Sequence, residues 1–509
     1  MKTEEEGSLT IFSALSLLLI LSFLLALLEG ARVSGLQMMD TLAADTGMDC
    51  VAAEYQTVLW DKYHLLYLDG AYGWDQFDEN KVSSRVMDYV AGNLSETGEN
   101  SVFRTKLCEA SLLEYMFATD NDGTGMLRQA SAYMKRHLPE DVAKKMYQQY
   151  QDGKKAEADG KTEYSVEDAD QAIINAKKEK EQADQNDKEG APQEEAGEKN
   201  IQDNENNHAQ DAEDSKKESP IQIVLQLKQN ALLGMTVSDM SSLSAKAVEA
   251  KDMVSNRQCE TGRYDMKKAE KMNVSDRVMV LEYIGKHFSD YTEPGKGDLT
   301  YEMEYILCGK DTDKKNLESS IERLMRMREA ANVAHIIADR EKLNQTLMIA
   351  TSLAGFSGNP AVVKIVQIGV VAAWAYVESI LDLRTLLSGG KISLIKSAAE
   401  WTTDLKKLGE IVTGEGKARE CKNGLSYQAY IKQLLFAMKE KKMAYRMMDI
   451  MELAMQKEQN GKNARMDHMI DNMICELRFE AKPLFAKRSL YGDMEMGGYT
   501  FLKDRNCHT

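Results

Sequence analysis

The sequence predicts a mainly α-helical protein with minor β structure (α+β), anchored in a membrane by a single N-terminal transmembrane helix. Three observations support this class. The chain begins with a long apolar run, most later segments carry apolar residues at helical spacing, and strand-like segments are few and short. With 509 residues, the chain exceeds the usual size of one domain, so we expect two or three structural units.

The apolar run covers residues 8–28, SLTIFSALSLLLILSFLLALL, and contains no charged residue in 21 positions. At about 1.5 Å per residue, such a helix crosses the roughly 30 Å hydrocarbon core of a bilayer. The apolar region of a cleaved signal peptide is shorter, about 7–15 residues, and a small-residue cleavage site follows it. Here the run continues directly into Glu29. We therefore predict a retained single-pass anchor over 8–28.

Beyond the anchor, helical spacing continues without a proline to about Asp61, which predicts an amphipathic stalk. We predict a short strand over 64–68, a helix over 81–94, a strand or a helix over 107–116, and helical structure over 125–150. We expect a short N-terminal segment over 1–7 and the transmembrane helix over 8–28. The stalk and the N-terminal part of an extracytoplasmic domain follow over 29–150, and a disordered acidic linker or insertion covers 151–219. Residues 220–509 are expected to form an α-rich C-terminal domain packed with 29–150.

The acidic segment 151–219 holds 21 Asp and Glu but only 10 Lys and Arg, a net charge of −11 within a chain of −17. Its apolar residues are few. Fixing the backbone costs roughly 1–2 kcal/mol per residue, and so few apolar side chains cannot offset that cost. This composition predicts disorder. The acidic balance also argues against a nucleic-acid partner, since phosphate binding requires clustered Lys and Arg.

Residues 361–387 form a second hydrophobic region, but its uncharged centre, 365–377, is only 13 residues long. That length favours a buried core helix over a membrane span. Elsewhere in this half of the chain, helical spacing predicts helices over 221–235, 237–254, 275–288, 314–347, 424–453 and 466–477, and the tail near 494–501 predicts short strands.

We find no motif that identifies a catalytic, cofactor or metal site. The run Asp120–Gly125 resembles the start of a calcium loop, but Ser131 stands where the bidentate Glu is required, so we predict a turn. His335 lies on an apolar helix face, where a core histidine is expected, and the 30 methionines suit helix packing. We expect a protein that is not an enzyme and binds no cofactor.

The N-terminal residues Glu6-Gly7-Ser8-Leu9-Thr10-Ile11-Phe12 and the leucine-rich run after them are similar to pilin-like proteins of tight-adherence (Flp) pilus systems. In that family a Gly precedes the processing site, the hydrophobic helix anchors the subunit and the bulk faces outward. The resemblance implies a processing junction between Gly7 and Ser8. The chain departs from the family pattern at Phe12, where a Glu is expected.

A second resemblance covers most of the chain outside the acidic segment. It is carried by LLEGARVSG (27–35), EYQTVLWDKYHLLYLDGAYG (54–73), LTYEMEYILCGKDTDKKNLE (299–318) and AAWAYVESILDLRTLLSGGKISLIKSAAEWTTDL (372–405). These stretches resemble an uncharacterised family, a domain of unknown function, found in membrane-anchored proteins of Gram-positive bacteria. Its members are often encoded near Flp-type secretion or pilus components, and the family brings no known active site.

Together these features predict a membrane-anchored, extracytoplasmic structural or assembly component of a tight-adherence (Flp) pilus or related secretion apparatus. The partners expected are the membrane, through residues 8–28, and other proteins of the assembly, with no nucleic acid. The expected location is the cell membrane, with one span and the bulk of the chain outside. Two other classes stay open: a cell-surface binding module for an envelope or host ligand, and an enzyme with an unrecognised site.

Overall fold

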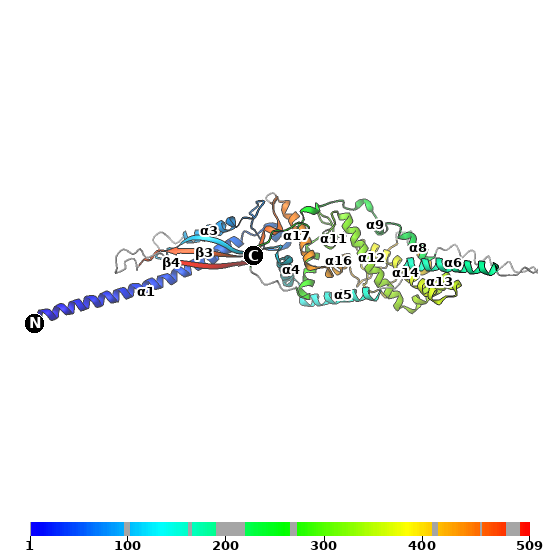
Figure 1. Cartoon of the computed structure of the whole chain (residues 1–509), viewed down its shortest axis with the longest axis horizontal. Helices are drawn as coiled ribbons and strands as arrows, with labels where there is room; N and C mark the ends of the chain where they lie inside the picture. Colours follow the sequence, from blue (N-terminus) through cyan, green and yellow to red (C-terminus); the bar gives the residue numbers. More distant parts are fainter. Residues whose placement is uncertain are drawn as a thin grey trace, which may run out of the picture. The chain divides into compact units, whose positions relative to one another are not determined.

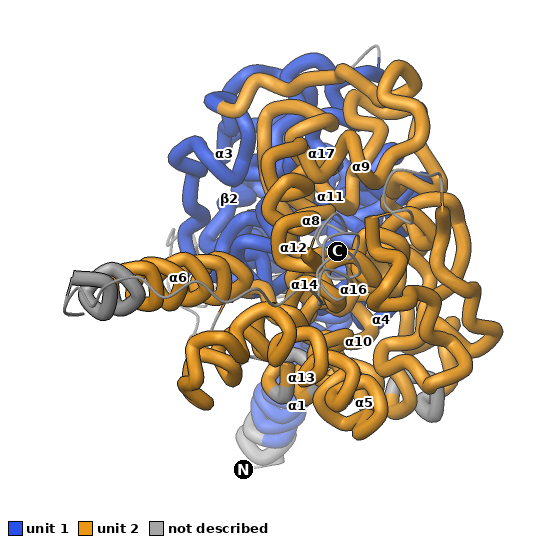
Figure 2. Tube along the Cα trace, turned by 90° about the vertical axis from the view of Figure 1, so that its right-hand side faces the viewer, with its two compact units in different colours: residues 1–133, 251–272, 440–509 blue, residues 134–250, 273–439 orange. Residues whose placement is uncertain are grey.

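A computed structural model describes residues 2–95, 102–160, 165–189, 219–264, 272–409, 416–458, 461–484 and 499–508. These residues form a mainly helical protein with one small antiparallel sheet (Figure 1). The chain divides into two compact units that alternate along the sequence (Figure 2). Unit 1 comprises Met1–Tyr133, Lys251–Met272 and Glu440–Thr509, and unit 2 comprises Met134–Ala250 and Asn273–Lys439. The C-terminal residues 440–509 belong to the same unit as the N-terminal region.

Unit 1 combines a long N-terminal helix with the sheet. Its elements are α1 (Lys2–Ala52), α2 (Thr57–Tyr63), β1 (Leu68–Asp69), α3 (Glu79–Ser95), β2 (Lys106–Phe117), the 3-10 turn Asp120–Gly123, most of α4 (Thr124–His137), α17 (Glu440–Gln456), the 3-10 turn Met466–His468, β3 (Met469–Ala481) and β4 (Tyr499–His508). Strand β3 pairs antiparallel with β1, β2 and β4.

The core of unit 1 lies between one face of this sheet and the helices α1 and α3. Along β3, buried Met473, Cys475, Leu477 and Phe479 alternate with more exposed residues, as expected for a strand with one face covered. Ala43, Ala44 and Met48 of α1 and Val82, Val86 and Val90 of α3 pack in the same cluster. In Figure 1 the second half of α1 runs beside β3 and β4, while its first half extends past the strands.

Three predictions of secondary structure, two in unit 1 and one mainly in unit 2, were wrong. The segment 466–477 is not a helix, since most of it forms β3, whose burial alternates with a period of two. The strand expected over 64–68 is reduced to β1, because His64 adopts a left-handed conformation and ends α2. The helix expected over 237–254 is replaced by an irregular segment in which Ala247 forms a β-bridge with Thr312.

Unit 2 is helical in the part of the chain that the structure describes. Its elements are α5 (Glu140–Asp159), α6 (Val166–Glu189), α8 (Pro220–Leu227), α9 (Leu232–Thr236), α10 (Val274–His287), α11 (Glu302–Cys308), α12 (Asp313–Ala338), α13 (Arg340–Ala354), α14 (Pro360–Leu387) and α16 (Tyr427–Phe436), with short 3-10 turns at Met240–Ser242, Ala250–Asp252, Gly355–Ser357 and Leu405–Lys407.

Helix α14 is the core helix of unit 2, as its interrupted hydrophobicity predicted. It begins at the cap Asn359 with Pro360 in its first turn, and α6, α8, α12 and α13 pack against it. The helix expected over 314–347 is divided into α12 and α13 because the Asp339 side chain accepts hydrogen bonds from the N–H groups of Glu341 and Lys342 and so caps a new helix. The helix expected over 424–453 is likewise divided, into α16 and α17.

The prediction of disorder from residue 151 differs from the structure over 151–159 and 166–189, which belong to α5 and α6. Val166, Ala169, Ile173 and Ala176 of α6 are buried, and they recur every three or four residues, so they form one apolar stripe against α14. The small size of this stripe explains why composition alone suggested disorder. The remainder of the predicted linker, 190–218, lies outside the described residues.

Candidate functional site

Residues 9–28 in the first half of α1 present a predominantly apolar surface without charged side chains. Large hydrophobic side chains on this segment are at least half exposed: Leu9, Ile11, Phe12, Leu15, Leu17, Leu18, Leu19, Ile20, Leu21, Phe23, Leu24, Leu27 and Leu28. Water-exposed apolar area costs about 25 cal/mol per Å², and soluble monomers rarely carry a continuous patch of this extent. The helix is long and apolar enough to span a membrane.

The apolar surface ends at a pair of buried charges. Arg32 Nη1 lies 2.8 Å from Glu29 Oε1, and both side chains are 7 % exposed or less. Arg32 Nε also donates a hydrogen bond to the carbonyl oxygen of Val102 (2.6 Å), and the N–H of Leu484 donates to the Glu29 carboxylate. From this pair onward, one face of α1 is covered by the sheet and α3.

Asp40 lies on the covered face of α1 and is completely buried. Burial raises the pKa of the Asp40 carboxyl to about 6, because desolvation disfavours the ionised form more than Thr105 and Lys503 favour it. The packed half of α1 therefore contains one carboxyl group that titrates in the mildly acidic range.

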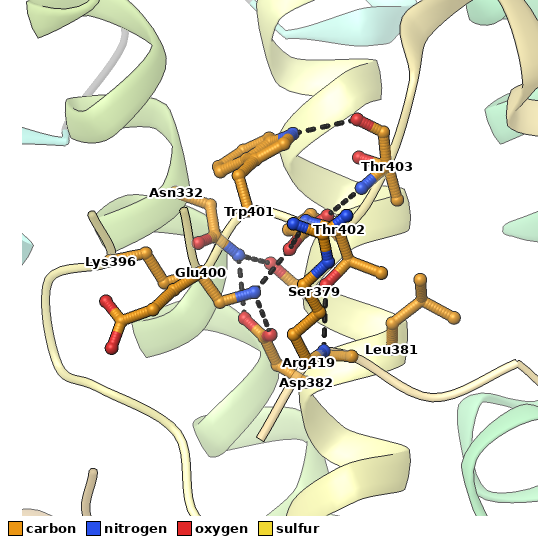
Figure 3. A network of polar contacts seen from close by, with 12 residues as sticks. Asn332, Ser379, Leu381, Asp382, Lys396, Glu400, Trp401, Thr402, Thr403 and Arg419 are labelled. Atoms are coloured by element: carbon orange, nitrogen blue, oxygen red, sulfur yellow. Dashed lines mark hydrogen bonds and ion pairs between the residues drawn. The ribbon is translucent and has the colours of Figure 1, made fainter. Parts of the chain in front are cut away.

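Unit 2 encloses a second set of ionisable residues, the buried charge network, which consists of Arg328, Asn332, Glu378, Asp382 and Lys396. Helix α12 supplies Arg328 and Asn332 one turn apart, and α14 supplies Glu378 and Asp382 one turn apart. Lys396 follows α14 in the chain. Figure 3 shows Lys396, Asp382 and Asn332 directed toward one another. Two cations and two anions thus meet in one place.

Hydrogen bonds and ion pairs connect the members of the network. Arg328 Nε and Nη2 each lie 3.0 Å from Asp382 Oδ2, and Asn332 Nδ2 donates to the same oxygen at 3.0 Å. Lys396 Nζ contacts Glu378 Oε1 and lies 2.5 Å from Asp382 Oδ1. All four charged side chains have no solvent exposure. A solute from outside cannot reach them, so the network cannot act on an external substrate in this conformation.

The backbone that follows Lys396 and the indole rings of Trp401 and Trp374 surround the network. The N–H groups of Thr402 and Thr403 donate to the Glu378 carboxylate at 3.1 and 2.9 Å. The Trp401 ring lies over Lys396 Nζ, 5.8 Å from atom to centroid, and contacts Trp374 edge to face. Charges buried in this way are costly unless they are paired, and here each has an opposite charge in contact.

The structure places the residues singled out in the sequence as follows. Gly7 and Ser8 lie within the first turns of α1, so the helix runs through the predicted processing junction. The Asp120–Gly125 run is a turn in which Asn121 and Asp122 have positive φ angles, and Asp120 accepts hydrogen bonds from the N–H groups of Phe117 and Gly262. Within the described ranges, no group of three potential metal ligands converges.

His335 is partly buried on α12 rather than fully enclosed in the core. Its ring stacks on Trp401 with centroids 4.9 Å apart, and burial lowers the pKa of the imidazole. The buried charge network itself was missed. Glu378 and Asp382 were visible as charges four residues apart in an apolar segment, but Arg328 and Lys396 carried no local signal that pointed to them.

A comparison with family models matches residues 210–481 to a family of unknown function, DUF5702. Two of the four stretches that carried the resemblance, 299–318 and 372–405, lie inside the matched region, and so does the whole buried charge network. No curated protein and no solved structure matches the chain. Because the family model covers more than half of its length, the chain belongs to the family of unknown function DUF5702.

Proposed function

We propose that this chain is a membrane-anchored, extracytoplasmic subunit with a structural or assembly role, pilin-like or accessory to a tight-adherence (Flp) pilus or a related secretion apparatus of a Gram-positive bacterium. The observation that carries the proposal is the division of α1 at Glu29. Residues 9–28 before it expose large apolar side chains and carry no charge, and one face of the helix after it packs into unit 1. One continuous helix therefore connects a membrane-sized apolar surface to a folded body.

The second support is the resemblance of residues 6–12 to the processing region of pilin-like proteins. The division of α1 suits that resemblance, because a subunit of this kind needs a hydrophobic helix for anchoring and a rigid connection to the part that makes contacts. Outside the apolar segment, α1 still exposes Met38 by 74 % and Leu42 by 59 %. These two side chains lie one turn apart and offer a surface for protein contacts.

A cell-surface binding module is the alternative, and a cavity in unit 1 favours it. The cavity measures about 340 Å³ and opens beside α2, within the size range of small-ligand sites. Its lining is polar and apolar in similar measure and consists of Gln56, Thr57, Val58, Asp61, Lys62, Met455, Glu458 and Gly461. Retention of the full chain on isolated cell-envelope material, lost in Asp61→Ala and Glu458→Ala variants, would support this alternative.

The orientation can be tested with a membrane-impermeant thiol reagent on intact cells. Met348 is 73 % exposed on α13, so a Met348→Cys variant should be labelled above the level of the parent chain. The parent chain is the control for background labelling, and labelling of Met348→Cys after lysis gives the total amount of reactive thiol. Labelling of Met348→Cys only after lysis would overturn the extracytoplasmic placement.

The pilus role itself needs a genetic test with a contact readout. A photo-crosslinking residue at Met38 should capture pilin or platform proteins, whereas the same residue at Met240, 42 % exposed in unit 2, serves as a control for nonspecific capture. A deletion strain should lose surface fibres and regain them with the intact gene. Normal fibres in the deletion strain would refute the pilus role while leaving the membrane anchor intact.

A further inference from the structure

The buried charge network contains an amine and two carboxyl groups arranged for a reaction within the chain. Lys396 Nζ contacts Glu378 Oε1 on one side and lies 2.5 Å from Asp382 Oδ1 on the other. Although Lys396 Nζ is this close, Asp382 Oδ1 accepts no hydrogen bond within the described part of the chain. The amine is therefore in contact with the carboxyl group without being hydrogen-bonded to that oxygen.

The two oxygens of Asp382 have different surroundings. Oδ2 is held by three donors at 3.0 Å, two from Arg328 and one from Asn332. Donors placed in this way stabilise negative charge that develops on a carboxyl oxygen when a nucleophile adds to its carbon. Oδ1 lies beside the Lys396 amine. One oxygen is thus positioned to carry charge and the other to leave.

We propose that Lys396 and Asp382 form an intramolecular isopeptide bond, with Glu378 as the catalytic acid and base. Glu378 takes a proton from the Lys396 ammonium, and the neutral amine adds to Cγ of Asp382. The resulting oxyanion sits on Oδ2, between Arg328 and Asn332. Glu378 passes the proton that it took from the ammonium to Oδ1. It then takes a second proton from the nitrogen now attached to Cγ and passes this proton to Oδ1 as well. The Cγ–Oδ1 bond breaks, and Oδ1 leaves as one water molecule. The ammonium and the carboxylate become one amide and one water, and Glu378 returns to its starting state.

The site favours this condensation for two physical reasons. The reacting atoms are already in contact inside a rigid core, so little orientational entropy remains to be lost. Condensation also replaces a buried ion pair by a neutral amide, which removes two charges from a region without solvent exposure. Arg328 and Glu378 keep opposite charges afterward, so the site stays neutral. The indole of Trp401 covers the amine and limits the return of water.

The bond would connect α14 to the segment that follows it. Residues 383–395 would lie in a closed ring, and the segment carrying Thr402 and Thr403 would stay fixed against Glu378. Such a link resists mechanical and thermal unfolding at this point of unit 2, because the ring cannot open without breaking a covalent bond. This inference is independent of the proposed function, since it rests only on residues of unit 2.

Mass spectrometry of the full chain in detergent micelles tests the proposal. The intact protein should be lighter than its sequence by the mass of one water molecule, and proteolysis should release a branched peptide that contains both Lys396 and Asp382. Lys396→Met and Glu378→Gln variants should have the full mass of their sequences and no branched peptide. Lys391→Met removes an exposed lysine nearby and should keep the mass deficit.

Peptide mapping distinguishes the loss of one water molecule from a loss of mass caused by processing at the N-terminus. A parent chain with a cooperative unfolding transition, the full mass and no branched peptide would overturn the proposal, and the residues would then form a permanent ion pair. A branched peptide that persists in Glu378→Gln would overturn the role of Glu378. Because Glu378→Gln retains both Lys396 and Asp382, a folded sample of that variant separates loss of chemistry from loss of structure.

Discussion

Gly369 of α14 packs directly against Ala169 of α6, so closely that a Cβ atom at position 369 would overlap the Cβ of Ala169. The contact brings an acidic, weakly apolar helix onto the core helix of unit 2. Small residues on both sides allow the two helix backbones to approach, and the close approach compensates for the narrow apolar stripe of α6. The position of α6 therefore depends on the absence of a side chain at residue 369.

The first prediction follows from this contact. Gly369→Ala should destabilise unit 2 by about 1–3 kcal/mol, the usual cost of overpacking, despite the higher helix propensity of alanine. Thermal unfolding of the full chain measures the effect. Gly234→Ala in α9 is the control, because nothing lies within 4 Å of a Cβ there, and it should not destabilise. Equal stabilities for the two variants would contradict the close packing of α6.

The second prediction concerns Glu304 of α11, which is fully buried and accepts a hydrogen bond from Tyr427 Oη at 2.7 Å. Desolvation raises the pKa of this carboxyl to about 8 from an ordinary value of 4.5. The folded state therefore keeps a proton that the unfolded state releases between pH 4.5 and 8. Stability should fall across this window as pH rises, by up to about 1.4 kcal/mol per pH unit.

Glu304→Gln should remove this pH dependence, because glutamine keeps the acceptor for Tyr427 and cannot ionise. Denaturant unfolding at several pH values between 4.5 and 8 measures the slope of stability against pH. The variant should gain most relative to the parent at pH 8. Glu293→Gln, which replaces an exposed carboxylate on the loop after α10, is the control and should leave the slope unchanged. The same slope in Glu304→Gln and the parent would show that Glu304 is ionised in the folded state.

The third prediction concerns Arg257 in unit 1, which pairs with both Glu452 and Asp467. Arg257→Met leaves two buried carboxylates without this partner and should destabilise the protein by about 3–5 kcal/mol. Lys315→Met, which breaks an exposed pair with Asp311, is the control and should cost less than about 1 kcal/mol. A similar cost for both variants would mean that the buried pair is weakly coupled to folding.

Arg257→Met should also change the response to acid. Desolvation alone would raise the pKa of Asp467, but hydrogen bonds from Arg465, the Glu260 N–H and Arg257, together with the charge of Arg257, hold it down to about 2. The stability that Asp467 contributes is therefore present above about pH 3.8 and is lost as pH falls toward 2. Without Arg257 the pKa of Asp467 in the folded state should rise, so this contribution becomes smaller and its loss is complete at a higher pH. Acid titrations followed by circular dichroism would show this shift.

Periodic spacing predicted the helices whose buried face is broad, such as α3, α10 and α14. It failed at β3, where methionine and isoleucine suit either class and only the burial of alternate residues identifies the strand. It also failed at α6, whose stripe of Val166, Ala169, Ile173 and Ala176 is too small to stand out from acidic neighbours. Both errors arise because tertiary contacts, rather than local composition, decide the structure there.

The buried charge network could be predicted from the sequence only in part, for a different reason. Glu378 and Asp382 are separated by one helical turn, so their shared face could be anticipated. Their partners Lys396 and Arg328 lie 18 and 54 residues away along the chain, and nothing in the local sequence relates them. Convergence of distant side chains is a property of the packed core, so the chemistry proposed for Lys396 and Asp382 required the structure.

The fourth prediction concerns the apolar half of α1. If this surface lies in a bilayer, a Leu18→Arg, Leu21→Arg double variant must place two guanidinium groups near its centre, at a cost of about 2.5–3.5 kcal/mol each. The full-length parent should resist alkaline extraction from membranes, and the arginine variant should become extractable. A Leu18→Ala, Leu21→Ala variant should remain in the membrane, because it shortens the side chains without adding charge. Both leucines are more than half exposed, so neither change disturbs the packing of unit 1. If the arginine variant resists extraction as the parent does, the body of the protein, and not α1, must hold the chain at the membrane.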